Sequence, residues 1–71
     1  MNDLKKLQLL LPHWIEHNEE HAHEFRTWTE RMQRIGKADS AERLLAAATS
    51  LQQAGDHLSN LLDKIGQMTE T

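Results

Sequence analysis

The sequence predicts an all-α fold in which two amphipathic helices pack as an antiparallel hairpin. Apolar residues recur at helical spacings of three and four positions in two long segments, and a glycine turn near residue 36 separates these segments. The 71 residues are enough for a single domain, 1–71, with a small core.

The first apolar stripe keeps one helical phase across Pro12. A proline inside a helix removes a hydrogen bond and kinks the helix, whereas a proline in the first turn is tolerated. The sequence therefore allows a kinked helix over residues 3–35, or a short helix that ends near Leu10 and a second that begins at Pro12. The unbroken phase favours nearly collinear segments. The stripe consists of Leu4, Leu7, Leu11, Ile15, Asn18, Ala22, Phe25, Thr29 and Met32.

Gly36 occupies the position of a left-handed helix stop, and a second helix follows it. Asp39 or Ser40 is the predicted N-cap, with Glu42 in the first turn. Gly66 is expected to mark the end of this helix or the start of fraying. A turn of about four residues makes the helices antiparallel neighbours, in a register where paired residue numbers sum to about 75. The second stripe consists of Ala41, Leu44, Ala48, Leu51, Gly55, Leu58, Leu62 and Ile65.

The second helix carries more apolar surface than one partner helix can cover. Without cysteine, the chain cannot use a disulfide to stabilise so small a core. Two hairpins related by a two-fold axis would cover the surplus as a four-helix bundle, so we expect a homodimer. The surplus residues are Leu45, Ala47, Ala54 and Leu61.

Charge and hydropathy exclude several classes of partner. The net charge is −3 with neutral histidines, and the basic residues are dispersed, so we expect no nucleic-acid binding and no binding to anionic membranes. No apolar stretch is long enough to span a bilayer. The short apolar run after Lys6 is interrupted by Pro12 and has no cleavage site, so it does not fit a signal peptide. Together with the absence of cysteine, these features predict a cytoplasmic protein.

Histidine and glutamate are concentrated in the segment HWIEHNEEHAHEF, residues 13–25. Histidines four residues apart stack on one side of a helix, and a third ligand from a neighbouring helix can close a metal site. In the expected register His57 falls at the level of His17. We predict a site for zinc, nickel or another divalent transition metal. Its ligands are His17, His21, His57 and Glu24, with His13 and Glu20 in reserve.

An alternative interpretation needs no metal. His21 can simply pair with a nearby glutamate at the boundary of burial, and Trp14 and Trp28 can pack at a helix or dimer interface or bind a protein partner. Asn18, which is polar within the apolar stripe, is expected to set the helix register. Enzymatic activity is not expected, because the chain has no zinc-protease motif, nucleophile elbow or phosphate-binding loop.

The segment LLPHWIEHNEEHAHEFRTW resembles a family of short prokaryotic helical domains with no established function. The resemblance covers residues 9–28 closely and 38–65 more loosely, and it implies an amphipathic helix, a glycine turn and an alanine-rich second helix. This family differs from hemerythrin-like proteins, which distribute their ligands over four helices. Its signature positions are His13, Trp14, His17, Asn18 and His21.

Overall fold

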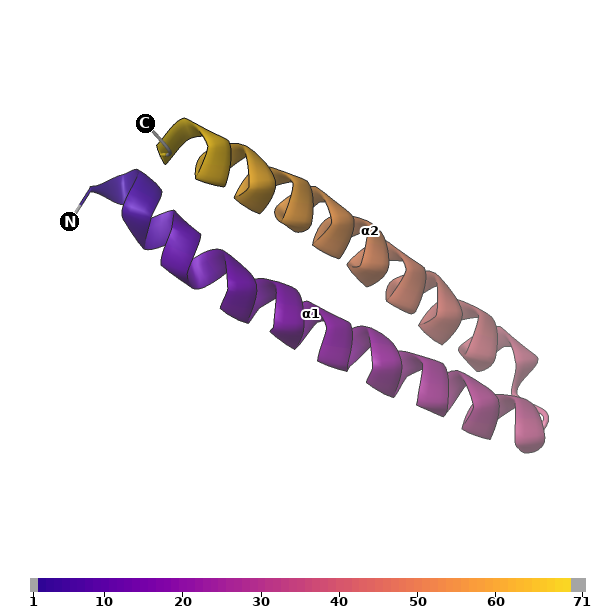
Figure 1. Cartoon of the computed structure of the whole chain (residues 1–71). Helices are drawn as coiled ribbons and strands as arrows, with labels where there is room; N and C mark the ends of the chain where they lie inside the picture. The colour runs from indigo at the N-terminus through magenta and orange to yellow at the C-terminus, as the bar shows by residue number, and fades with distance from the viewer. Residues whose placement is uncertain (1, 70–71) are drawn as a thin grey trace.

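The computed structural model describes residues 2–69, and for Thr69 the backbone alone, as two long helices joined by a short turn. Helix α1 spans Asp3–Arg34 and helix α2 spans Ala38–Thr69. The helices run antiparallel, with both chain ends at one end of the molecule and the turn at the other (Figure 1). The Cα trace measures 55 × 16 × 13 Å, so the molecule is one helix thick. The predicted all-α hairpin is confirmed.

Helix α1 is continuous through Pro12, which decides between the two alternatives. Proline lacks the N–H that would donate to the Gln8 carbonyl, and its ring crowds that carbonyl, so the helix is expected to bend there. The first turns of α1 run at an angle to the remainder in Figure 1. Leu11, directly before Pro12, is fully buried. Packing against α2 keeps the apolar stripe of α1 on the same side before and after the proline.

The start of α1 has a cap that the sequence analysis missed. The side-chain oxygen of Asn2 accepts a hydrogen bond from the Lys5 amide at 2.8 Å. This bond satisfies one of the amide groups that a helix N-terminus leaves free. Asparagine directly before Asp3 was the available signal.

The turn between the helices has the hydrogen bonds of a Schellman motif. The Lys37 amide donates to the Met32 carbonyl at 2.8 Å, and the Gly36 amide donates to the Gln33 carbonyl at 3.1 Å. Gly36 has a φ of +76°, which a residue with a Cβ adopts only with strain. The predicted glycine stop is therefore confirmed.

Two predicted boundaries of α2 are wrong. The Lys37 carbonyl accepts the first helical hydrogen bond, from the Ala41 amide at 3.0 Å. Helix α2 thus begins at Ala38, and Asp39 lies in its first turn rather than at the N-cap. Gly66 lies inside α2, since α1 extends far enough to support it and a helical glycine costs only about 1 kcal/mol.

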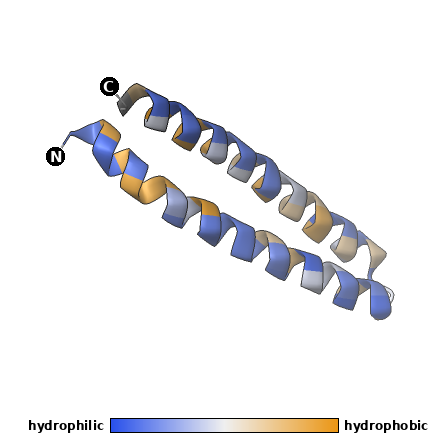
Figure 2. Ribbon diagram, in the orientation of Figure 1, coloured by the Kyte–Doolittle hydropathy of each residue, from blue (hydrophilic) through white to orange (hydrophobic). Residues whose placement is uncertain are grey.

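The core of the hairpin is a thin seam between the helices. Only Leu11 and Ile65 are large and fully buried among the described residues, and both lie toward the end that carries the termini. Ile35 and Met68 are exposed although both are large and apolar. Figure 2 shows hydrophobic residues in the first turns of α1 and along the side of α2 that faces α1. The buried residues are Leu11, Ala22, Thr29, Ala41, Ala48 and Ile65.

Candidate functional site

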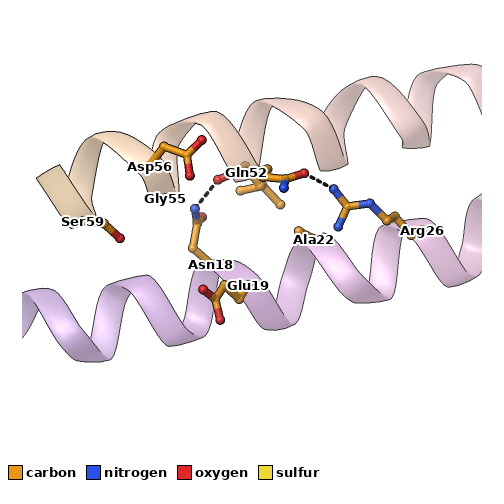
Figure 3. Close-up of a pocket in the computed structure, with 9 residues that line it drawn as sticks. Asn18, Glu19, Ala22, Arg26, Gln52, Gly55, Asp56 and Ser59 are labelled. Carbon is orange, nitrogen blue, oxygen red and sulfur yellow. Dashed lines mark hydrogen bonds between the residues drawn. The ribbon is translucent and has the colours of Figure 1, made fainter.

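The two flanks of the hairpin differ in chemistry, and one of them is polar. Figure 3 shows a groove on this flank, where the side chain of Asn18 crosses from α1 and donates a hydrogen bond to the Leu51 carbonyl of α2. Arg26 donates to the Gln52 side chain farther along the groove. A Cβ at Gly55 would lie 3.4 Å from Nδ2 of Asn18, so the glycine leaves room for this crossing. These contacts fix the register of the two helices, in which Gly55 lies beside Asn18.

The opposite flank carries the histidines. A second, shallow groove runs there between the helices, and among the described residues of α2 only Leu58 lines it. Ser59, one position later, lines the polar groove instead. The seam between the helices therefore separates a histidine flank from a polar flank. The α1 residues that line the histidine groove are His13, Trp14, His17, Asn18 and His21.

Three imidazoles form a row along this flank of α1. The ring centroids of His17 and His21 are 4.7 Å apart in an edge-on arrangement, and those of His13 and His17 are 5.8 Å apart. The row continues to Phe25, whose ring centroid lies 6.2 Å from that of His21. These distances follow from four-residue spacing on a helix, which places side chains one above the other.

His21 also contacts the glutamate that the sequence paired with it. Its Nδ1 lies 3.5 Å from Oε1 of Glu24, as expected for residues three apart on a helix. A carboxylate at Nδ1 leaves Nε2 as the nitrogen that faces outward. Glu20 is exposed.

The predicted metal ligands do not come together within one chain. Throughout the described part of the chain, no three histidine, aspartate or glutamate side chains lie close enough to hold a metal ion. His57 precedes Leu58 by one residue, so it is rotated about 100° away from the seam, on the side opposite to Ser59. It belongs to the histidine flank but points outward instead of across the seam. A metal-binding role for these residues stays a prediction.

The histidine flank also exposes aromatic and aliphatic side chains. Trp14 remains 42% exposed and Trp28 46% exposed. Cζ of Arg31 lies 4.6 Å from the ring centroid of Trp28, a distance suited to a cation–π interaction. This arginine contact was not predicted, although three-residue spacing on a helix signals it.

These side chains form a second seam on α1, next to the one that faces α2. Its residues are spaced alternately by four and three positions, which is the heptad pattern of helices that pack against another helix. Leu10 on α1 and Ile35, which directly follows α1, extend the pattern beyond the two tryptophans. In the sequence the stronger stripe that faces α2 obscures this second pattern. We call this set the tryptophan seam: Leu10, Trp14, His17, His21, Glu24, Trp28, Arg31 and Ile35.

Comparison with known families agrees with the resemblance seen in the sequence. Residues 7–65 match a family described as a domain of unknown function, DUF8180. The chain is a member of the DUF8180 family. The matched region of this DUF8180 chain contains both seams of α1, the turn, and α2 through Ile65. Searches of curated proteins and of solved structures found no match.

Proposed function

We propose that this DUF8180 chain is a self-associating helical module, in which two copies pair through the tryptophan seam as a four-helix bundle. The module acts by binding and not by catalysis, and it works in the cytoplasm, which its lack of cysteine suits. No helix within residues 2–69 is long and apolar enough to cross a membrane.

The surface area of the hairpin is the observation that carries this proposal. The chain has an accessible surface of 5596 Å². A typical folded monomer of 8.2 kDa exposes about 4,500 Å². The excess of about 1,100 Å² is close to the roughly 800 Å² that each partner buries in a stable protein interface. Pairing of two copies would bring each chain to an ordinary surface for its size.

The position of the exposed apolar residues supports a face-to-face arrangement. The tryptophan seam runs along α1, and Ala47, Ala54, Leu61 and Met68 follow α2 at seven-residue intervals on the same flank. Each tryptophan keeps about 100 Å² exposed, and covering that area is worth about 2.5 kcal/mol. The polar groove of Figure 3 offers no comparable apolar surface.

Sedimentation equilibrium tests the proposal. The wild-type chain is expected to have twice the mass of one chain at micromolar concentration. Replacement of both Trp14 and Trp28 by glutamine should raise the dimer Kd more than about 100-fold, because buried tryptophans dominate interface energies. The control replaces Leu9 and Leu45, which are as exposed as the tryptophans, and should remain dimeric. Leu45 was grouped with the surplus residues in the sequence, but it lies seven residues before Gln52 of the polar groove and so falls on the opposite flank. A monomeric wild type, or equal loss of dimer in both variants, contradicts the proposal.

Binding of a divalent transition metal such as zinc or nickel is a second candidate function. The observation that favours it is the 4.7 Å separation of the His17 and His21 rings. Two imidazoles that share a zinc ion at 2.0–2.1 Å with a tetrahedral angle have ring centroids about 5 Å apart. Calorimetric titration of chelator-treated protein with zinc or nickel tests it, since a site of three protein ligands should bind far more tightly than about 100 μM.

A further inference from the structure

We propose that the metal site of this chain is shared between two copies, with His17 and His21 from one copy and His57 from the other. This inference rests on the dimer proposed above. A shared site accounts for the absence of a three-ligand group within the described residues of one chain. It also lets His57, which points outward from its own chain, bind the metal together with His17 and His21 of the other copy.

The half-site on α1 consists of His17 and His21. His17 and His21 have nearly the ring separation that a shared ion requires. Because Glu24 lies at Nδ1 of His21, Nε2 of that ring is free to bind a metal. The ring of His13 lies next to that of His17, on the side away from His21. His13 and His21 are eight residues apart, about 12 Å along the helix, which is too far for them to share one ion. One helix thus supplies two ligands and leaves the site open.

The arrangement of the two copies decides which residues meet across the dimer. A face-to-face dimer has its two-fold axis in the plane between the copies. If that axis is parallel to the helices, α1 of each copy lies on α2 of the other, and residues at the same height along the rod meet. Trp28 then faces Ala47, and His21 faces Ala54. This packing places large side chains against small ones, as interdigitated helices require.

The perpendicular two-fold axis fits the surface less well. With this axis α1 packs antiparallel on α1 of the second copy, and the two helices are centred on each other between His17 and His21. Trp14 would then face Glu24 of the second copy and Trp28 would face Leu10, so large side chains would meet large ones instead of alanines. Because interdigitated helices pack large residues against small ones, the parallel axis fits the surface better.

In the proposed site the third ligand, His57, comes from α2 of the second copy. In the hairpin, Gly55 and Leu58 lie at the same height along the rod as Asn18. A Cβ at Gly55 would lie 3.4 Å from Nδ2 of Asn18, and Leu58 lines the histidine groove together with Asn18. His57 is therefore at the height of the half-site, between His17 and His21. In the dimer with a parallel axis, His57 of the second copy approaches the half-site from the opposite side. Three imidazoles and one open position form a common coordination of zinc. Two-fold symmetry gives two such sites per dimer.

A mixing experiment tests the shared site directly. One variant carries His57→Ala, and the other carries His17→Ala and His21→Ala. Each alone should bind zinc at least about tenfold more weakly than wild type, and His23→Ala, on the outer side of α1, should bind within about twofold of wild type. Unfolding and reannealing the two variants together creates mixed dimers in which one complete site survives. High-affinity binding should return at one ion per mixed dimer.

Each outcome has a definite meaning when the oligomeric state is measured on the same samples. Restored binding in the mixture supports a shared site, because ligands within one chain cannot be recombined by mixing. A dimeric wild type with no zinc or nickel binding below about 100 μM overturns this inference and leaves the dimer proposal standing. Full-affinity binding by the His57→Ala variant alone also overturns it. A monomeric wild type contradicts the dimer proposal itself.

Discussion

The burial of Leu11 beside the helix-weakening Pro12 allows the phase of α1 to be tested with two neighbouring leucines. Leu11 is 0% exposed, whereas Leu9, two residues earlier on the same turn, is 68% exposed. Replacement of a buried leucine by alanine costs 2.7–5.0 kcal/mol in a well-studied lysozyme series, with the smaller values where neighbours can move into the space. The seam here is only two helices wide, so we expect about 3 kcal/mol for Leu11→Ala.

Leu9→Ala makes the same chemical change on the outer surface of α1. Little apolar area is lost there, and alanine is slightly the better helix former, so we expect a change of less than about 0.5 kcal/mol. For a domain of this size 1 kcal/mol moves the melting temperature by about 4–8 °C. Leu11→Ala should therefore lower the Tm by about 12–24 °C and Leu9→Ala by less than about 4 °C.

Thermal unfolding followed by far-UV circular dichroism measures both variants. Protein concentration must be equal in all samples, because dimer formation makes the Tm depend on concentration. Similar Tm values for the two variants, or a greater loss for Leu9→Ala, would show that α1 before Pro12 does not face α2 as the structure has it.

Two further predictions concern the turn and the polar groove. Gly36→Ala should lower the free energy of unfolding by about 1 kcal/mol, because φ is +76° there, whereas Gly66→Ala should raise it by up to about 1 kcal/mol, because an added Cβ meets nothing within 4 Å. Urea denaturation measures both, and effects of the same sign would refute the assigned backbone roles. Asn18→Ala should cost about 1 kcal/mol for the lost hydrogen bond to Leu51. Asn18→Asp should cost more, because a carboxylate would face a carbonyl oxygen, and wild-type stability of this variant would show that the bond contributes nothing.

The hairpin could be predicted from sequence because its signals are local. Helical spacing, a glycine at the helix stop, and the short distance between the two stripes depend only on neighbours along the chain. The N-cap of α2 was wrong for a similarly local reason. The Schellman bonds of Gly36 and Lys37 complete the reversal so quickly that the helix begins before Asp39, and no propensity of Asp39 or Ser40 could reveal that.

The candidate site was predicted in part. The row of His13, His17 and His21 follows from four-residue spacing and lies where the helical phase placed it. Convergence of His57 with this row within one chain was wrong, because a one-residue step rotates a helical side chain by about 100°. A register states only the height at which residues meet, and height alone does not decide which way a side chain points.

The order of residues along the chain determined by itself that two helices form, where they reverse, and which side of each is apolar. Tertiary structure decided that α1 passes through Pro12 as one helix, that the buried seam is thin, and that a second seam remains exposed. The physical reason is that periodicity describes one helix at a time, whereas burial depends on how much of each surface another helix covers.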